Sequence, residues 1–541
     1  MRIVASVFSV LALALAGCTH VGTSKETIIG QPSSGRTLQV GAAIAPNSFN
    51  PLLSTESVEN MLDRLIYDQL VVIDNTGTAQ PDLAVQVPSL QNGGISRDGL
   101  TITYKLRKGV RWQDGAPFTS DDVRFSFNQV MNPRNNVSSR VGYEMVQRVE
   151  TPDRFTVAFH LRKPYAPIVT TLFSSANSPN FVVPSHLLHS YADLNSIPFN
   201  SHPVGTGPYR MAKWLRGDHI EFVANSNYFL GKPKIARIVV HFIPDENTAV
   251  NQMRTHELDW FYAASETSYS QLKTIPGVRN VISPQNSYRG MLINTESPLV
   301  GDIRVRRAIA YAIDKESIVQ QVTYGAAHAA TEDIPSFMWA YDRAVPAYRY
   351  NPAKAKQLLA QAGWAPGAEG ILHKAGTPLE LRFVLRQGAA TDTRMSVAIQ
   401  SQLRAVGIDP LIKTYQGSML FGGGTSGVLS GGHYDIDLSG FGSGFDPDNS
   451  AQFTCNARPP NGFNWSRYCT AEMDAAQAQA VSSYDRNVRK AAYAKIETLL
   501  ARDVPQIFMY WQPEIDAVNP ELKNFTGGPF FPNWNAYQWE L

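Results

Sequence analysis

One stretch of the chain, residues 107–123 (RKGVRWQDGAPFTSDDV), brings basic and acidic side chains, a tryptophan and a Gly/Pro turn close together. Such residues could serve acid–base catalysis, but the stretch contains no nucleophile paired with a base. Its residues have local structural uses instead. Gly115 suits a turn after a strand that ends at Leu106, and Thr119 followed by Asp122 is typical of a capping box at a helix start. We therefore interpret this stretch as scaffold.

Other residues that could take part in catalysis or in metal or phosphate binding lack the partners that such chemistry needs. His186 and His189 lie one turn apart but have no third metal ligand nearby. The glycine-rich residues 420–435 lack the spacing of a phosphate-binding loop, and the DPDN run at 446–449 lacks the glutamate of an EF-hand. No G-x-S-x-G motif occurs. We expect no catalytic residues, no metal site and no cofactor, and hence a protein that is not an enzyme.

The chain begins with a segment that predicts export and lipid attachment. Arg2 precedes an apolar run of signal-peptide length, and the run ends in Leu-Ala-Gly-Cys at residues 15–18. Small residues before a cysteine at this position are typical of a lipoprotein signal, in which the thiol of Cys18 takes a diacylglycerol. The alternative is an ordinary secretory signal that contains a cysteine. Residues 1–17 are therefore predicted as a signal peptide, and residues 18–36 as a flexible tether.

Two further cysteines remain, Cys455 and Cys469. Export places them in an oxidising compartment, where an even pair favours a disulfide. The alternative, a pair of metal ligands, lacks histidine or cysteine companions at ligand spacing. We expect the disulfide.

The size and composition of the chain indicate a large globular protein. Its 541 residues exceed what one hydrophobic core usually supports, which predicts two or three domains. The formal net charge is only +2 and no basic run occurs, so nothing indicates a nucleic acid as partner.

Strand and helix patterns alternate along the chain and predict an α/β fold. Residues 101–106 and 156–161 alternate as strands do, and residues 235–243 are apolar enough for a central strand. A helix is expected after an N-cap at Asn351 with a stop at Gly363, and another from Asp392 to Gly407. Residues 305–322 predict a helix with Val305, Ile309, Ala312 and Ile313 on one stripe.

Five segments resemble, in order, the family-5 extracytoplasmic solute-binding proteins. This family comprises the dipeptide-, oligopeptide- and nickel-binding components of ABC importers. The resemblance rests on LRKGV, DGAPFT and DDV within residues 81–127, on GTGPY within 204–250, and on RVRRAIAYAIDK within 293–319. Residues 348–364 and 399–409 resemble helices of the family. The resemblance covers the chain from about residue 38 to its end.

The resemblance implies a periplasmic-binding-protein-like α/β fold of type II, cluster C, with a cleft between two lobes and an extra inserted domain. Domain I would be discontinuous, domain II an insertion in it, and domain III the opposing lobe. Their implied boundaries are 37–56, 203–292 and 512–541 for domain I, 57–202 for domain II, and 293–511 for domain III. Two crossing strands near 290–295 and 508–515 would act as the hinge.

The resemblance also implies where ligand would bind. The positions that correspond to cleft contacts are Asn47, Tyr288, Arg386, Phe441, Gly442, Ser443, Asp446, Tyr510 and Trp511. The dipeptide-binding branch, which also carries a D-P-D-N run before two bridged cysteines, has an aspartate for the peptide amino group where this chain has Ser443. A serine cannot neutralise a buried ammonium, so either Asp446 takes that role or the ligand is not a simple peptide.

The implied function is capture of a small solute, a peptide in the first instance, by closure of the cleft. Partners would be an ABC permease with its ATPase, and the membrane through the lipid anchor. The protein would be a monomer in the periplasm or another extracytoplasmic compartment. Open alternatives are a receptor for an oligosaccharide, an opine-like compound or a metal chelate. Outside the family, the alternatives are a lipid-anchored hydrolase and a periplasmic chaperone.

Overall fold

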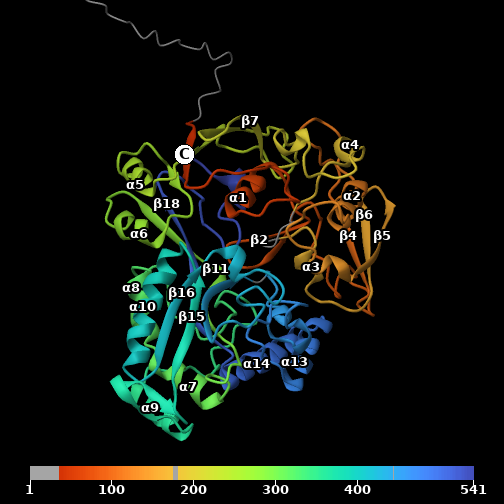
Figure 1. Ribbon diagram of the computed structural model, residues 1–541. Helices are drawn as coiled ribbons and strands as arrows, with labels where there is room; N and C mark the ends of the chain where they lie inside the picture. The colour runs from red at the N-terminus through yellow and green to blue at the C-terminus, as the bar shows by residue number, and fades with distance from the viewer. Residues whose placement is uncertain (1–35, 175–180, 443) are drawn as a thin grey trace, which may run out of the picture. The chain divides into compact units, whose positions relative to one another are not determined.

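The computed structural model describes residues 36–174, 181–442 and 444–541 (Figure 1). The predicted signal peptide, Cys18, nearly all of the tether and Ser443 lie outside the described residues. Within these three ranges, no helix combines the length and apolar character that crossing a membrane requires.

A ten-stranded mixed sheet forms the centre of the fold, with helices packed on it. Its strand order is β16-β15-β17-β11-β18-β10-β1-β9-β8-β7. Strand β1 runs parallel to both β9 and β10, and β15 runs parallel to both β16 and β17. The strands of this sheet are β1 (Leu38–Ala42), β7 (Tyr209–Leu215), β8 (His219–Ala224), β9 (Arg237–Phe242), β10 (Trp260–Phe261), β11 (Arg279–Ile293), β15 (Glu380–Arg386), β16 (Asp409–Tyr415), β17 (Ile436–Gly442) and β18 (Gln506–Val518).

Strands β11 and β18 connect the two halves of this sheet. They pair antiparallel along their length, with register shifts between Pro284 and Tyr288 and between Arg289 and Gly290. The C-terminal part of β11 also pairs with β17, whereas the end of β18 pairs with β10. The chain therefore passes between the two halves along two adjacent strands. The prediction that both crossing segments are strands is confirmed.

The remaining strands form three smaller sheets. Strands β4 (Thr101–Lys105), β6 (Thr156–Leu161) and β5 (Val146–Asp153) form a sheet next to helix α2 (Ser120–Met131). The others are the pair β2 (Val71–Ile73) and β3 (Ala79–Pro81), and the sheet of β12 (Ala365–Pro366), β13 (Leu372–Lys374) and β14 (Thr377–Pro378). The strands predicted at 101–106, 156–161 and 235–243 are present, and β9 lies between β1 and β8 as a central strand should.

The other α-helices are α1 (Ser57–Ile66), α3 (Ile168–Thr171), α4 (Ser185–Leu188), α5 (Glu246–Arg254), α6 (Glu266–Leu272), α7 (Ile303–Ala312), α8 (Lys315–Val322), α9 (Pro352–Gln361), α10 (Ala390–Arg404), α11 (Gly417–Leu420), α12 (Ser450–Phe453), α13 (Ala471–Ser482) and α14 (Arg486–Asp503). Helices α7 and α9 pack on each other, as do α13 and α14. In Figure 1, α7, α9 and α10 accompany β15 and β16, while α13 and α14 form a separate pair.

Two predicted helices differ from the structure. The helix expected over 305–322 is two helices, because Ile313 leaves the helical conformation and the Asp314 side chain caps α8 by accepting from the Ser317 backbone N–H at 3.1 Å. The predicted apolar stripe is nevertheless buried. Helix α10 begins at Ala390 rather than Asp392, since the Asp392 carboxylate faces the Arg289 guanidinium at 3.5 Å instead of capping the helix.

The charged stretch 107–123 is scaffold, as predicted. Thr119 is the N-cap of α2, and its backbone N–H donates to the Asp122 carboxylate at 2.9 Å in a capping box. The indole of Trp112 is buried and donates to the same carboxylate at 3.4 Å. Gly115 takes a positive φ of 93°, which the turn requires. The side-chain amide of Gln113 donates to the Tyr209 carbonyl at 2.8 Å, which ties the turn to β7.

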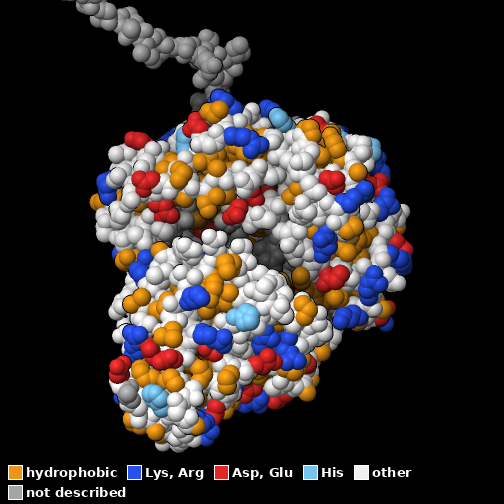
Figure 2. Space-filling model, in the orientation of Figure 1, with side chains coloured by type: hydrophobic (Ala, Val, Ile, Leu, Met, Phe, Trp, Pro, Cys, Tyr) orange, Lys and Arg blue, Asp and Glu red, His pale blue; other side chains and the backbone are white. Residues whose placement is uncertain are grey.

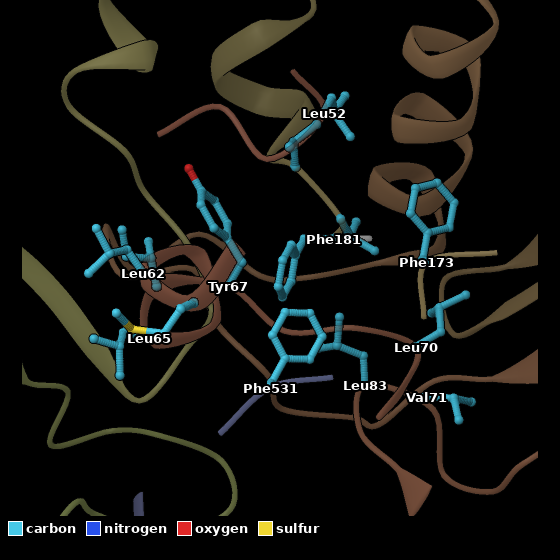
Figure 3. Close-up of a cluster of buried hydrophobic side chains, with 14 of the residues drawn as sticks. Leu52, Leu62, Leu65, Tyr67, Leu70, Val71, Leu83, Phe173, Phe181 and Phe531 are labelled. Atoms are coloured by element: carbon cyan, nitrogen blue, oxygen red, sulfur yellow. The ribbon is translucent and has the colours of Figure 1, made fainter. Parts of the chain in front are cut away.

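The N-terminal part of the chain is built around a core of large apolar side chains (Figure 3). The rings of Phe181 and Phe531 lie 5.9 Å apart between their centroids, and Tyr67 packs on Phe181 at 6.1 Å. Leu70 and Leu83 are fully buried nearby. Burial of each such side chain adds about 1.5–3 kcal/mol to the free energy of unfolding. Because Phe531 belongs to this core, the core holds the C-terminal residues against the N-terminal part of the chain.

Candidate functional site

A cavity of about 500 Å³, here called the main pocket, is the larger of two that meet at Asp446. One wall comes from Ser54, Thr55, Asn60, Ser138, Ser139, Val141, Tyr143, Tyr165, Pro167, Thr170 and Thr171, and the other from Phe441, Gly442, residues 444–446, Asp448, Ala451, Gln452 and Phe463. The two walls are separated by some 270 residues of sequence between 171 and 441. A molecule in this cavity would therefore contact parts of the chain that only the fold brings together.

Hydroxyl groups dominate the first wall. The side chains are Ser54, Thr55, Ser138, Ser139, Tyr143, Tyr165, Thr170 and Thr171. Ser54 is fully buried, and the hydroxyls of Thr170, Thr171 and Tyr165 already donate within the protein, the first two to the Pro167 carbonyl and the third to Asp448. A hydroxyl oxygen that donates can still accept, so this wall can accept hydrogen bonds from N–H or O–H groups of a bound molecule.

Aromatic rings form part of the second wall. Phe441, at the end of β17, lies 6.0 Å from Phe463 and 6.0 Å from Trp465 between ring centroids. Phe421 continues the row at 5.6 Å from Trp465. Phe463 is 49% exposed, so the row extends from the pocket to the surface. These four residues are called the aromatic row below.

Asp446 lines the main pocket and already has partners. Its carboxylate forms a buried ion pair with Arg489 of α14 and accepts from the Tyr493 hydroxyl at 3.1 Å. Burial raises the pKa of Asp446, and the Arg489 guanidinium opposes that rise. The carboxylate that the sequence offered as a replacement amino-group partner is thus neutralised within the protein.

Asp448 stands two residues further on and is only partly buried. One carboxylate oxygen accepts from the Tyr165 hydroxyl at 3.0 Å, and the other accepts from the Ser450 backbone N–H at 3.0 Å. No basic side chain pairs with it among the residues described. Asp448 is therefore the carboxylate in the main pocket with capacity for a cationic group.

The structure brings together four of the residues predicted to contact ligand. Phe441, Gly442 and Asp446 line the main pocket. Tyr288 lies one residue behind it, since its hydroxyl donates at 2.8 Å to the side chain of Gln452, which lines the pocket. Trp511 pairs with Tyr288 across β11 and β18, and packs against Tyr341 rather than lining the pocket.

The remaining predicted residues lie elsewhere. Asn47 is exposed, and its backbone N–H donates to the Glu59 carboxylate at 2.9 Å. Arg386 is exposed at the end of β15, with its guanidinium beside Gly417. Tyr510 is buried in β18 opposite Arg289 of β11. None of the three lines the main pocket as the structure describes it, and Ser443 lies outside the described residues.

The hydroxyl wall and Asp448 were missed by the sequence prediction. The hydroxyl residues carried no signal, because serine and threonine are common and no motif marks them. Asp448 belongs to the DPDN run, which was considered as a calcium loop and as a feature of the dipeptide-binding branch, with Asp446 and not Asp448 as the candidate ligand contact. The side chains of that run hydrogen-bond to other parts of the protein: the Asn449 amide, for example, donates to the Asp333 carboxylate at 3.0 Å. Among the described residues, no group of three or more His, Cys, Asp and Glu side chains is placed to hold a metal ion.

A disulfide joins Cys455 and Cys469, as expected. The two cysteines are 14 positions apart in sequence, and the segment between them contains Phe463 and Trp465. The crosslink limits the conformations of this segment and so helps to fix the aromatic row.

The fold and the pocket define a binding protein with a known kind of architecture. Residues 78–462 match the bacterial extracellular solute-binding proteins, family 5 (middle). Because this match covers more than half of the chain, the protein belongs to that family. The mixed α/β, periplasmic-binding-protein-like fold that the resemblance implied is confirmed.

Individual relatives are similar over almost the whole chain. The oligopeptide-binding protein AppA of Bacillus subtilis is 29% identical over 552 aligned residues, which cover 99% of this chain and 98% of AppA. The solved structure of AppA with a nonapeptide has a TM-score of 0.75 at 28% identity, covering 94% of this chain and all of that one. NikZ of Campylobacter jejuni in complex with Ni(L-His) has a TM-score of 0.76 at 28% identity, covering 93% and 99%.

Proposed function

We propose that this protein is the peptide-binding component of an ABC importer, and that peptides bind in the main pocket. The observation that carries the proposal is the composition of the pocket from two distant parts of the chain. Membership of the solute-binding family supports it, as does similarity to an oligopeptide-binding protein. A permease with its ATPase would then be the partner that receives the peptide.

The pocket chemistry suits a peptide. Hydroxyl side chains would pair with the peptide backbone, and the aromatic row would pack against apolar side chains. Asp448, rather than Asp446, would accept the amino terminus, because Asp446 is paired with Arg489. Phe441 and Gly442 would contact the ligand directly, and Tyr288 would act through Gln452.

Capture would proceed by closure of one side of the pocket on the other. A ligand shifts a conformational equilibrium only if it binds one state better than the other, and a peptide that contacts both walls meets that condition. The three domains proposed from the sequence are 37–56 with 203–292 and 512–541, 57–202, and 293–511. Strands β11 and β18 would carry the hinge, since they connect the two halves of the ten-stranded sheet.

The site of action would be outside the cytoplasm, as the family description states for its members. The lipid anchor at Cys18 and the signal peptide before it remain predictions from the sequence. An anchored monomer would stay close to its permease, which raises the effective concentration of loaded receptor at the membrane.

A peptide screen tests the proposal. Pools of di- to pentapeptides are added to the purified protein and the melting temperature is measured, because a ligand at 100 times its Kd adds about 2.7 kcal/mol of stability. D448N should bind peptides with a free amino terminus about tenfold more weakly, while N-acetylated peptides are unaffected. D121N, an exposed aspartate on α2, is the control. Stabilisation by oligosaccharides or metal chelates and not by peptides would reject the peptide assignment.

The aromatic row favours a second candidate within the same role. Four aromatic rings that run from the pocket to the surface could stack on a non-peptide solute such as an oligosaccharide. Mass spectrometry of solute extracted from the native protein distinguishes the candidates. It also tests the hydrolase alternative, because a receptor returns its solute chemically unchanged.

A further inference from the structure

A buried side-chain amide, that of Gln452, lies in the wall of the main pocket. Gln452 belongs to helix α12 and is 6% exposed. Its Oε1 accepts from the Tyr288 hydroxyl at 2.8 Å, whereas its Nε2 makes no hydrogen bond to any residue that the structure describes. An amide N–H that is buried without an acceptor is costly, so a solute that displaces water from this group has to supply one. The pocket therefore presents a donor whose partner must come from the solute.

The Tyr288 hydroxyl fixes which end of this amide faces the pocket. Tyr288 lies in β11, is 2% exposed, and packs its ring edge-on against Phe508 at 5.1 Å between centroids. Its hydroxyl also lies 3.3 Å from the Oε1 of Gln506, but a phenol has one proton to donate, and the shorter contact is to Gln452. The carbonyl end of the Gln452 amide is thus held by the protein, and the N–H end is left for the pocket.

The start of α12 is held by side chains that do not line the main pocket. The Asn449 amide donates to the Asp333 carboxylate at 3.0 Å, and its Oδ1 accepts from the Gln477 amide at 2.6 Å. The Asn449 carbonyl in turn accepts from the Gln452 backbone N–H at 2.9 Å. Backbone and side chain of Gln452 are therefore both positioned without help from a ligand, and such preorganisation lowers the cost of binding.

The side chains around Gln452 offer acceptors more readily than donors. An ionised Asp448 can only accept, and the hydroxyl protons of Tyr165, Thr170 and Thr171 are already donated within the protein. Asp448 and Gln452 are four positions apart in the chain and line the same wall of the main pocket. An acceptor for a cation and a donor for a carbonyl are thus supplied by one short segment.

We propose that Gln452 is a specificity-determining residue of the main pocket, whose Nε2 donates to a carbonyl oxygen beside the cationic group of the solute, and that Tyr288 is its positioning residue. The preferred solute then carries an α-amino carbonyl group, in which one carbon separates the ammonium from the carbonyl. A simple amine would satisfy Asp448 and leave the Gln452 amide without an acceptor. The proposal rests on the proposed function in placing the solute in the main pocket with its cation at Asp448.

The first test uses two small probes and no peptide. Phenylalaninamide and 2-phenylethylamine share a ring and an ammonium group, but only phenylalaninamide has a carbonyl beside the ammonium. Both are titrated into the full chain at about pH 6, where the amines are protonated, and binding is followed by ligand-observed NMR. Wild type should bind phenylalaninamide about tenfold more tightly, and Q452M, which keeps the length of the side chain without an N–H donor, should lose that preference. Q479M, the same change at an exposed glutamine of α13, is the control and should retain it.

Two further variants separate recognition from a general loss of structure. Q452E keeps an oxygen that accepts from Tyr288 but places a second carboxylate oxygen where the N–H stood, so it should reverse the order of the two probes. A damaged fold would weaken both probes and would not reverse their order. Y288F keeps the aromatic ring and releases the Gln452 amide, so the preference should fall to about threefold. An unchanged preference in Y288F would remove Tyr288 as the positioning residue.

The second test locates the carbonyl on a peptide. Alanine tetrapeptides are compared in which one peptide oxygen at a time is replaced by sulfur, a weaker hydrogen-bond acceptor of similar shape. Sulfur at the first carbonyl should weaken binding to wild type about five- to tenfold and leave binding to Q452M unchanged. A sulfur effect that Q452M erases at a later carbonyl instead would contradict the placement of the acceptor beside the cation.

The outcomes separate this proposal from the peptide function. If peptides bind but Q452M keeps the wild-type response to the probes and to sulfur, the role of Gln452 is wrong and the peptide function stands. If Q452M loses the preference for phenylalaninamide while no peptide binds, the role of Gln452 stands and the peptide function is wrong. A wild-type protein that binds neither probe nor any peptide would overturn both.

Discussion

Asp446 and Asp448 are separated by one proline yet have different chemical roles, because their surroundings differ. Asp446 is buried against Arg489 and Tyr493, whereas Asp448 is partly exposed and is held by a tyrosine hydroxyl. A buried charge that loses its partner is costly, while a partly solvated carboxylate can exchange water for a ligand. Asp446 therefore supports the structure of the pocket, and Asp448 is the residue that we propose for recognition.

The main effect of replacing Asp446 should be a loss of stability of the fold, and not a change in binding selectivity. D446N leaves the guanidinium of Arg489 buried without a carboxylate, which should reduce the free energy of unfolding by about 3–5 kcal/mol. Urea denaturation followed by tryptophan fluorescence measures the change. The matched variant D121N breaks an exposed pair with Arg124 and should cost less than about 1 kcal/mol. Equal effects in the two variants would contradict the assigned role of Asp446.

A buried group of three carboxyls should make stability depend on pH. Glu332, Asp333 and Glu497 are all buried, and burial raises the pKa of each. The pKa of Glu332 rises from 4.5 to about 9, with Asp333 adding to the effect of burial. The folded state therefore binds a proton more readily than the unfolded state. This contribution to stability is present below pH 4.5 and is lost as the pH rises toward about 9.

Replacing Glu332 by glutamine should flatten this pH dependence. Glutamine resembles the protonated acid but cannot ionise, so E332Q should be more stable than wild type at pH 8 and nearly equal to it at pH 5. Urea midpoints at the two pH values measure the difference. E316Q, at an exposed glutamate, is the control and should leave the slope unchanged. A wild-type slope in E332Q would contradict the prediction.

At the scale of elements, helix ends follow the local chemistry of a few residues. Helix α9 starts after Asn351, whose side chain accepts from the Lys354 backbone N–H at 2.9 Å, with Pro352 as its first residue. Gly363 follows its end with a φ of 88°. These signals are contiguous in the chain and were predictable. Asp314 and Asp392 were not, since an aspartate can cap a helix or form an ion pair, and its partner in space decides which.

The GTGPY motif positions β7 against the end of α1. The Gly207 backbone N–H donates to the Ile66 carbonyl at 2.7 Å, and a Cβ on Gly205 would lie 1.9 Å from that same oxygen. Glycine is required there by close approach of two backbones. This packing supplies a physical reason for glycine at these positions of the motif.

Alanine at position 205 should accordingly disrupt the junction of α1 and β7. G205A must displace the backbone of Ile66, and we expect a loss of roughly 3 kcal/mol, measured as a lower melting temperature by circular dichroism. G423A is the matched control, because a Cβ there meets no atom within 4 Å, and it should change stability by less than about 0.5 kcal/mol. A normal melting temperature for G205A would show that the two backbones can separate at little cost.

At the scale of the whole molecule, the fold joins distant segments into one pair of cavities. Strands β11 and β18 hold the halves of the ten-stranded sheet together, and the pockets are built from residues on both sides of the sequence of β11. Surface charges of both signs are interspersed on the face drawn in Figure 2. That face therefore carries no broad field of one sign.

Attachment to the membrane depends on Cys18 if the lipoprotein prediction is correct. C18S removes the acceptor of the diacylglycerol and should move the protein from the membrane fraction to the soluble extracytoplasmic fraction. Fractionation and labelling with radioactive palmitate measure the change, and T23A in the tether is the control. A C18S protein that stays in the membrane fraction would argue against acyl anchoring.

The sequence by itself determined the covalent and contiguous features of this protein. The cysteine pair, the capping box at Thr119, the strand alternation and the family motifs all depend on residues within a short span, so reading along the chain was sufficient to find them. Part of the lining of the main pocket, namely Phe441, Gly442 and Asp446, coincides with positions that the resemblance offered as ligand contacts.

Only the tertiary structure decided which predicted residues share a cavity and which charges remain available. Asn47, Arg386 and Tyr510 were expected together with Phe441, but the fold places them elsewhere. Whether Asp446 or Asp448 can accept a ligand depends on Arg489, more than forty positions away in the chain. The physical reason is that burial and charge pairing are set by neighbours in space, and a linear pattern does not encode which distant side chains those neighbours are.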